Sequence, residues 1–308
     1  MSAEPAESTL AIAAVERDTG LSKDTLRVWE RRYGFPRPLR DAQGERGYPP
    51  EQVEKLRLLK RLMDAGHRPG KLVGLELEAL RGISQQAAAV ADRPPALSGP
   101  VLELLQGHDV AGLRRQLQQA LLALGLERFV TEHVAPMNAA VGEAWMRGEL
   151  SVAQEHVYTE AVQLVLRQAI GAMPEHPGPA APRVLMGTLP QEPHGLGLLM
   201  VEALLCLHGW RCVSLGVKVP LDELVTAAGL VGADVVALSF SGGFPAAQAT
   251  AALQELRRRL PGRTAIWAGG SSPALQRRLP EGVVPAPDIA LVPQLVAQWK
   301  RAVAGPAT

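Results

Sequence analysis

The chain has 308 residues, of which 47% are hydrophobic and 20% charged, with a formal net charge of +1. This length allows two or three domains with their own cores, and the composition excludes a disordered or fibrous chain. The two cysteines, Cys206 and Cys212, have neither a metal-ligand nor a redox spacing, and the sequence shows no signal-peptide or membrane-spanning pattern. We therefore expect a cytoplasmic protein with no membrane partner.

Positive charge is concentrated near the start of the chain. Residues 21–71 hold thirteen Lys and Arg against seven Asp and Glu, a net +6, so the remainder of the chain carries −5. A basic run is most often solvated surface, but a local excess of this size also predicts a segment that binds a polyanion such as DNA.

The pattern of residues 1–81 predicts a DNA-binding domain. A short helix ends at Gly20, and Ser22 is placed to cap a second helix, as in a helix-turn-helix. The segment 35–50 is rich in proline, arginine and glycine, so it cannot continue the second helix and predicts an extended wing. Pro50 suits the first position of a third helix.

The second helix of a helix-turn-helix enters the major groove, and flanking residues grip phosphates. Candidates for contacts with base edges and nearby phosphates are Lys23, Asp24, Thr25 and Arg27. Candidates for contacts with the DNA backbone are Arg31, Arg32, Arg37 and Arg40, with Tyr33 as a phosphate hydrogen-bond donor. Trp29 is expected in the core of this domain.

Residues 82–98 show little periodicity and contain adjacent prolines, so they are predicted to be a linker. Residues 99–178 have a helical pattern with short breaks, which indicates a four-helix bundle. Residues 179–308 then alternate short apolar strands with helices, which predicts a doubly wound parallel sheet. The predicted strands are 183–189, 211–216, 234–240, 264–270 and 289–292.

Within the bundle, Ser151 and Gln154 have the spacing of a capping box that starts a new helix. Trp145 then lies at the end of one helix, and Glu155 with His156 lies in the first turn of the next. We expect these three side chains to converge on one cavity. The simpler alternatives are that Trp145 is bundle core and that His156 is a buried structural histidine.

Glu192, His194, Gly195 and Gly197 follow the first predicted strand of the sheet. Ligands of such sheets bind beyond the carboxyl ends of the strands. His194 can present one ring nitrogen to a ligand while Glu192 holds the other, and the glycines allow close approach of the backbone. The alternative is that His194 only caps the following helix.

This segment resembles the cobalamin-binding signature of methionine synthase and methylmalonyl-CoA mutase, an acidic residue followed by His and Gly at fixed spacing. The later parts of that signature are also present. Ser239 and Ser241 follow Gly197 after 41 intervening residues, and Gly269 with Gly270 comes after 27 more.

The resemblance implies a Rossmann-like domain that binds cobalamin in its base-off form, with His194 as the lower cobalt ligand. Two positions depart from the pattern. Glu192 stands where aspartate is usual, which lengthens the reach to His194. Ser241 stands where leucine is usual, which weakens one contact with the displaced nucleotide tail.

Trp145, Glu155 and His156 resemble the Trp-x9-Glu-His motif of the light-sensing cobalamin repressors of the CarH and LitR type. The resemblance implies that the bundle covers the upper face of adenosylcobalamin, with these residues around the adenosyl group. In some members a histidine directly follows the tryptophan and captures cobalt after photolysis. Met146 occupies that position here, so this second ligation is not expected.

Residues 25–40 and 46–62 resemble the MerR winged-helix family. The resemblance implies that Arg46 and Tyr48 belong to the wing and approach DNA. A long dimerisation helix does not follow in the sequence, so we expect oligomerisation to come from elsewhere in the chain.

Together the resemblances imply a transcriptional repressor rather than an enzyme. It would bind double-stranded operator DNA in the dark as an adenosylcobalamin-loaded homotetramer, dissociate in light, and control carotenoid-type genes. Two alternatives remain: a cobalamin-independent repressor controlled by a protein antagonist, and a corrinoid carrier in methyl transfer.

Overall fold

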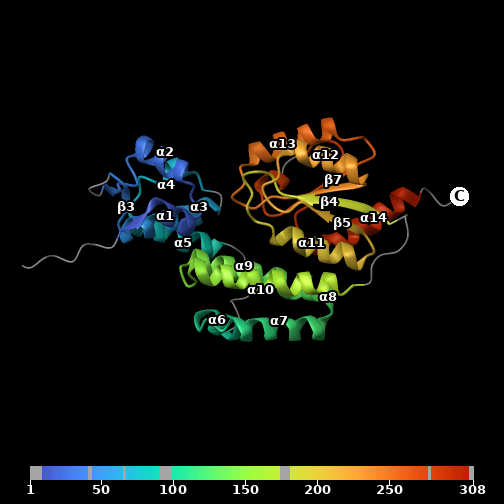
Figure 1. Cartoon of the computed structure of the whole chain (residues 1–308), viewed down its shortest axis with the longest axis horizontal. Coiled ribbons are helices and arrows are strands. Elements are labelled where there is room, and N and C mark those ends of the chain that lie inside the picture. The colour runs from blue at the N-terminus through green and yellow to red at the C-terminus, as the bar shows by residue number, and fades with distance from the viewer. Residues whose placement is uncertain are drawn as a thin grey trace, which may run out of the picture. The chain divides into compact units, whose positions relative to one another are not determined.

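The computed structural model describes residues 9–40, 44–64, 67–90, 99–173, 181–276 and 279–304. The chain divides into two compact units (Figure 1). The N-terminal unit comprises Met1–Ala96 and Val141–Glu155, and the C-terminal unit comprises Leu97–Ala140 and His156–Thr308.

The N-terminal unit contains the predicted winged helix-turn-helix. Its elements are β1 (Leu10–Ala11), α1 (Ile12–Thr19), α2 (Lys23–Tyr33), β2 (Leu39–Arg40), β3 (Arg46–Tyr48), α3 (Pro50–Asp64), α4 (Pro69–Leu72) and α5 (Leu77–Val90). Gly20 makes the turn between α1 and α2 with a left-handed φ of 69°, and the Ser22 hydroxyl accepts a hydrogen bond from the Thr25 amide at 3.1 Å. The strands pair antiparallel in the order β1-β3-β2, which forms the wing.

The core of this domain is formed by apolar side chains at helical spacing. Trp29 is buried, as predicted. The apolar stripe of α3 is also buried and consists of Val53, Leu56, Leu59 and Leu62. This packing fixes α2 with its opposite face toward solvent.

The first half of the predicted linker is helical, because α5 continues through residues 82–90. The sequence Gln-Gln-Ala-Ala-Ala of this segment is made of good helix formers, and it extends a helix that already contacts α3. Residues 91–98, and the predicted end of the bundle at residue 178, lie outside the described residues.

Residues 99–171 form the predicted helices. They are α6 (Gly99–Gln106), α7 (Val110–Leu124), α8 (Leu126–Arg128), the π-helical segment η1 (Phe129–Val134), α9 (Ala135–Met146) and α10 (Val152–Gly171). Because α8, η1 and α9 follow one another without a break, they correspond to one predicted helix; the π-helical turn was not predicted. The capping box is present: the Gln154 amide donates to the Ser151 hydroxyl at 3.2 Å, and the Ser151 amide donates to Gln154 Oε1 at 2.8 Å.

The rest of the C-terminal unit is the predicted parallel α/β domain. Its strands are β4 (Arg183–Gly187), β5 (Arg211–Ser214), β6 (Val235–Ser239), β7 (Ala265–Gly269) and β8 (Val283–Ala286). Its helices are α11 (Leu196–Leu207), α12 (Leu221–Val231), α13 (Ala246–Arg259) and α14 (Val292–Ala304), with short 3-10 turns at η2 (Pro273–Gln276) and η3 (Ile289–Leu291). In Figure 1, α12 and α13 cover one face of the sheet, and α11 and α14 cover the other.

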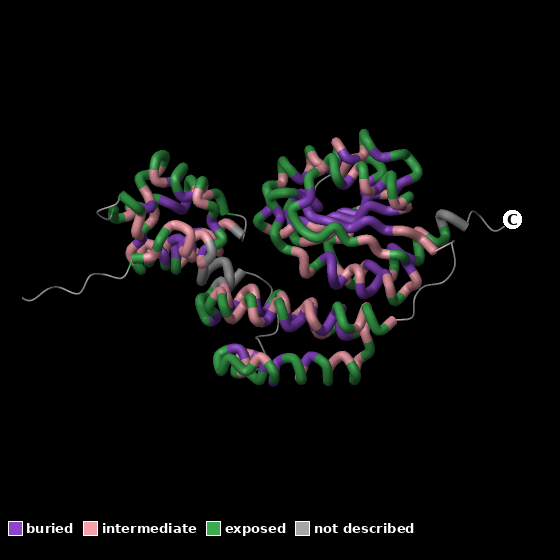
Figure 2. Tube along the Cα trace, viewed as in Figure 1, coloured by how far each residue is buried: buried purple, intermediate pink, exposed green. Residues whose placement is uncertain are grey.

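The strand order is β5-β4-β6-β7-β8, and all neighbouring strands are parallel. The central strands are buried on both faces (Figure 2). Because β4 lies between β5 and β6, the winding direction reverses between β4 and β6, and ligands bind outside such a switch point. The loops after β4 and β6 therefore define the expected position of a site.

The fifth strand was predicted at residues 289–292 but lies at Val283–Ala286. The Asp288 side chain accepts a hydrogen bond from the Ala290 amide at 2.9 Å, which starts a helical turn at the predicted position. Strand β8 contains Pro285, and proline is tolerated there because β8 is an edge strand.

Helix α11 lies between the sheet and the helices of the same unit. Its Met200 sulfur accepts a hydrogen bond from Asn138 at 3.2 Å, and Tyr158 of α10 donates to Asn138 at 2.5 Å. Near the end of α11, His208 lies 3.8 Å from Glu127. Helix α11 is therefore held by the sheet on one side and by these helices on the other.

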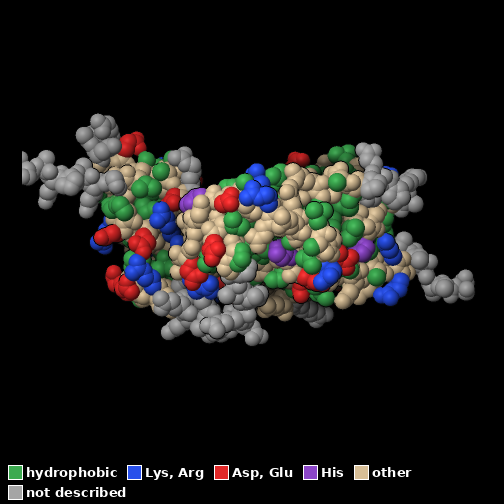
Figure 3. Space-filling view, turned by 90° about the horizontal axis from the view of Figure 1, so that it is seen from below, with side chains coloured by type: hydrophobic (Ala, Val, Ile, Leu, Met, Phe, Trp, Pro, Cys, Tyr) green, Lys and Arg blue, Asp and Glu red, His purple; other side chains and the backbone are tan. Residues whose placement is uncertain are grey.

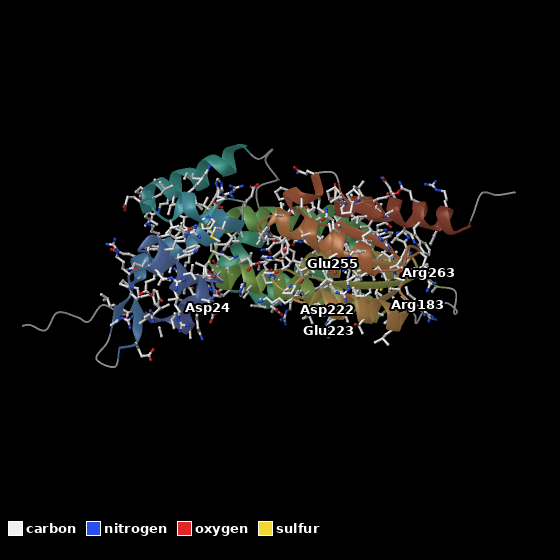
Figure 4. The ribbon with its side chains drawn as sticks, turned by 90° about the horizontal axis from the view of Figure 1, so that it is seen from above. Asp24, Arg183, Asp222, Glu223, Glu255 and Arg263 are labelled. Carbon is white, nitrogen blue, oxygen red and sulfur yellow. The ribbon has the colours of Figure 1, made fainter. Side chains whose placement is uncertain are left out.

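Charges of both signs are interspersed on the face shown in Figure 3. Figure 4 labels Asp222 and Glu223 on α12 and Glu255 on α13. Asp222 pairs with Arg259, and Glu255 pairs with Arg258 at 2.6 Å, so this acidic surface is largely compensated.

Candidate functional site

Glu192 is the centre of the hydrogen-bond arrangement at the switch point. Its side chain is 1% exposed. One carboxylate oxygen accepts from His194 twice, from the backbone amide at 3.1 Å and from ring Nδ1 at 2.6 Å, and the other accepts from the Ser241 amide at 2.7 Å. Glu192 thereby connects the loop after β4 to the loop after β6.

The pKa of Glu192 is lower than usual. Burial alone would raise this pKa, but the hydrogen bonds from His194 and Ser241 outweigh burial because they favour the charged form. Glu192 is therefore a buried carboxylate that stays ionised at neutral pH.

His194 lies at the end of this arrangement with 56% of its side chain exposed. Since Nδ1 faces the Glu192 carboxylate, an external metal ligated by this ring would bind through Nε2. A carboxylate behind an imidazole fixes the tautomer and makes the second nitrogen a better donor to a metal. This geometry fits the predicted role of His194 as a metal ligand better than a simple helix cap.

The remaining predicted residues lie at the same edge of the sheet. Ser239 pairs in register with Gly269 at the ends of β6 and β7, and a Cβ on Gly197 would lie 3.3 Å from the Ser239 hydroxyl. Gly270 has a φ of +106°, and a Cβ there would lie 2.2 Å from the Phe240 carbonyl oxygen. A Cβ on Gly195 would lie 2.8 Å from Val217. These glycines let the loops approach one another, so they shape the rim of the site through the protein's own packing.

The loop after β5 also reaches this edge, and the sequence prediction missed it. Val217 and Leu215 are 42% and 37% exposed. Thr188 ties this loop to the first, because its hydroxyl accepts from the Lys218 amide at 2.9 Å and donates to the Glu192 carbonyl at 2.6 Å. The only available signal in the sequence was the apolar Leu215 and Val217 beyond the end of the strand, next to a glycine.

Trp145 is the penultimate residue of α9, and Glu155 and His156 lie in the first turn of α10. His156 is exposed, which argues against the alternative of a buried structural histidine. The convergence of the three residues on one cavity stays a prediction. The side chain of Met146 lies outside the described residues.

Most of the predicted DNA-contacting residues lie on the solvent-facing surface of α2 and the wing. Exposed positions are Asp24, Arg27, Arg31, Arg32, Arg37 and Arg40, and half-buried positions are Lys23, Thr25, Tyr33 and Arg46. Asp24, labelled in Figure 4, lies in the first turn of α2 and 3.5 Å from Arg27. Arg46 of the wing pairs with Glu30 of α2 at 3.0 Å, which fixes the wing against the helix.

The predicted approach of Tyr48 to DNA is wrong. The prediction placed it on the wing near DNA, but it is completely buried in the domain core, and its hydroxyl is buried as well. Strand alternation alone would put Arg46 and Tyr48 on the same face of β3. The chain enters α3 at Pro50, however, and the Tyr48 ring packs into the core beneath it. Conversely, Val28 on α2 and Leu39 on the wing were missed, and they are 40% and 53% exposed among the basic residues.

Comparison with known families agrees with this geometry. The family "MerR HTH family regulatory protein" matches residues 10–76, and two families described as "B12 binding domain" match residues 100–170 and 182–285. The HTH-type transcriptional repressor CarH of Myxococcus xanthus is 34% identical over 278 residues, which covers 87% of this chain and 90% of that repressor. The chain belongs to this family of HTH-type transcriptional repressors.

The HTH-type transcriptional repressor CarA of Myxococcus xanthus is also 34% identical, over 75% of this chain and 76% of CarA. A methionine synthase of Mycobacterium tuberculosis is 25% identical over 171 residues, or 53% of this chain and 14% of that enzyme. A structure of the Methanosarcina barkeri monomethylamine corrinoid protein has the same fold over 65% of this chain and 96% of its own, at a TM-score of 0.52 and 16% identity.

As a member of the CarH and CarA family, the chain is a cobalamin-binding, DNA-binding regulator of transcription and not an enzyme. None of the described helices combines the length and apolar character needed to cross a membrane. The described residues also hold no cluster of three or more His, Cys, Asp or Glu able to bind a metal ion by themselves.

Proposed function

We propose that this repressor is light-responsive and uses adenosylcobalamin. In the dark it is a homotetramer bound to double-stranded operator DNA, and light releases it from carotenoid-type genes. The observation that carries the proposal is the buried, ionised Glu192 behind the exposed His194 at the switch point of the sheet.

His194 would hold the cobalt of the cofactor through Nε2, and the cofactor would be bound in its base-off form. Glu192 keeps His194 in the required tautomer, and the Ser241 amide keeps Glu192 in place. Leu215 and Val217 offer exposed apolar surface on the loop after β5, which suits the apolar edges of a corrin ring. Ser239, Gly197, Gly269 and Gly270 line the rim where the displaced nucleotide tail is held.

Trp145, Glu155 and His156 surround the upper ligand. The bound cofactor supplies one chemical property, a cobalt–carbon bond that light breaks. The role of these residues is to hold the adenosyl group while that bond is intact. Because Met146 replaces the histidine of some relatives, the chain offers no second imidazole at that position after the adenosyl group leaves.

The DNA-binding half of the proposal rests on the exposed basic face of α2 and the wing. A single winged helix offers few contacts, and several linked copies raise the effective concentration enough to gain roughly 10² to 10⁴ in avidity. Dissociation of the tetramer removes this gain without changing any contact with DNA.

Two alternatives make different demands on the same residues. A cobalamin-independent repressor controlled by a protein antagonist does not need an ionised carboxylate behind His194. A corrinoid carrier in methyl transfer does not need the basic face of α2. The arrangement described here is accounted for by the combination of both functions.

Titration of the full-length chain with adenosylcobalamin in the dark, followed by absorbance, tests the proposal. We expect the wild type to bind with a histidine-ligated spectrum and His194→Ala to lose tight binding and dark tetramers. His67→Ala, which alters an exposed histidine of the N-terminal unit, is the control and should behave as wild type. Unchanged affinity and spectrum in His194→Ala would refute the ligand assignment.

A further inference from the structure

Arg61 of α3 and Trp145 of α9 are in direct contact within the N-terminal unit. The guanidinium carbon of Arg61 lies 5.4 Å from the centre of the Trp145 ring. This distance is within the range of a cation–π interaction. The tryptophan assigned to the upper face of the cofactor is therefore held by a residue of the DNA-binding domain.

Arg61 also contacts the turn that follows Trp145. Gly148 has a left-handed φ of +77°, and a Cβ built on it would lie 3.2 Å from Arg61 Nη1. The turn is well formed, since the Glu149 amide donates to the Ala144 carbonyl at 2.9 Å. One guanidinium thus packs on both the indole and the turn that connects Trp145 to the helix carrying Glu155.

The contact leaves hydrogen-bonding groups unsatisfied. Arg61 Nε and Trp145 Nε1 are both buried and have no hydrogen-bond partner among the described residues. Buried donors without acceptors are destabilising. Burial, and secondarily the neighbouring Arg57, also lower the pKa of Arg61, so its charge is held in an unfavourable environment. A change of conformation that gives Arg61 Nε and Trp145 Nε1 hydrogen-bond acceptors would therefore be stabilising.

We infer that Arg61 is a positioning residue for Trp145, and that it holds the indole against the DNA-binding domain. Uptake of cobalamin takes the indole away from this guanidinium, so the Arg61–Trp145 contact competes with the cofactor. The inference rests on the proposed function, in which Trp145 serves the upper face. Through Arg61, a change in the position of Trp145 bears directly on α3 of the DNA-binding domain.

The test compares dark adenosylcobalamin binding by full-length wild type, Arg61→Ala and Arg61→Lys at one fixed protein concentration. Without the competing contact, Arg61→Ala should bind between about 2-fold and about 30-fold more tightly, the range of a cation–π interaction. Arg61→Lys keeps the charge but loses the planar stacking, so its affinity should lie between the two. Arg57→Ala is the matched control, because Arg57 lies one turn earlier on α3 and pairs with Asp18 at 2.8 Å.

A second readout does not depend on affinity. In protein labelled with 5-fluorotryptophan, the fluorine resonance of Trp145, assigned from Trp145→Phe, should shift in ligand-free Arg61→Ala and not in Arg57→Ala. An affinity of Arg61→Ala equal to or weaker than that of wild type would overturn the competition, as would an unmoved resonance. If wild type itself binds no cobalamin, both the proposed function and this inference fail. If wild type binds cobalamin and Arg61→Ala binds it no more tightly, only this inference fails.

Discussion

Single residues decide the chemistry of the site, and Glu192 is the clearest case. It is buried, yet three hydrogen bonds to its carboxylate keep it ionised. The glutamate is longer than the aspartate of the resembling signature, and its second oxygen reaches the Ser241 amide. The substitution therefore links two loops in addition to orienting His194.

Glu192→Gln removes the charge while keeping the shape of the side chain. Because the pKa of Glu192 is lowered on folding, this group stabilises the fold above its unfolded value of 4.5, and the contribution is lost as pH falls through the lower folded value. We expect cobalamin affinity to fall in Glu192→Gln, and its stability to decrease less steeply than that of wild type on acidification below about pH 4.5.

Urea unfolding at neutral and acidic pH measures the difference in stability. Glu223→Gln is the control, since Glu223 is an exposed carboxylate in the first turn of α12. Identical pH dependence of the free energy of unfolding in wild type and Glu192→Gln would contradict the role given to this carboxylate.

Arg27 of α2 is proposed to contact a base edge. It is exposed on the same face as Asp24, Val28 and Arg31. Arg27→Ala should weaken operator binding about 5- to 150-fold, which corresponds to about 1–3 kcal/mol for a lost base contact, and leave cobalamin uptake intact. Gel shifts at physiological salt test this, with Arg258→Ala of the C-terminal unit as the control. An unchanged shift for Arg27→Ala would remove it from the contact surface.

At the scale of helices and strands, the sequence predicts the features that neighbouring residues determine, such as the starts of helices. Ser22 and the Ser151–Gln154 pair mark helix starts because their side chains satisfy exposed amides, and both caps are present. The fifth strand was misplaced because Ile289–Leu291 is as apolar as a strand, and only the Asp288 side chain distinguishes it. Tyr48 was misassigned because the direction of its ring depends on α3, which no local pattern encodes.

In the site, too, the features that depend on local sequence were predicted, and those that depend on contacts between distant segments were not. The spacing from Glu192 to Gly270 was sufficient to predict which residues gather at the sheet edge. The contribution of Val217 and Leu215 was not predicted, because the approach of a third loop depends on the hydrogen bonds of Thr188. Likewise, the contact of Arg61 with Trp145 joins residues far apart in the chain.

Gly270 tests how the loops at this edge are packed. Gly270→Ala places a Cβ against the Phe240 carbonyl and imposes a φ that L residues rarely adopt. It should lower the free energy of unfolding by at least about 1–3 kcal/mol. Gly229→Ala is the control, because Gly229 lies in α12 with open space around its Cβ position, and it should be neutral or stabilising. Equal stability of the two variants in urea unfolding would contradict the crowding described.

At the scale of the whole molecule, the chain combines a DNA-binding domain with two regions that match B12-binding families. In the proposed function each part is weak by itself, because one winged helix would bind DNA through few contacts and one imidazole would supply a single bond to cobalt. We therefore propose that regulation depends on assembly, since avidity rises and falls steeply with the number of linked winged helices.

The most direct test of the account is size-exclusion chromatography with absorbance detection on the full-length chain mixed with adenosylcobalamin, kept dark and then illuminated. We expect the cobalt chromophore to co-elute with a tetramer in the dark, and light to convert this species to smaller ones. Failure of cobalamin to co-elute, or a tetramer that persists unchanged in light, would contradict it.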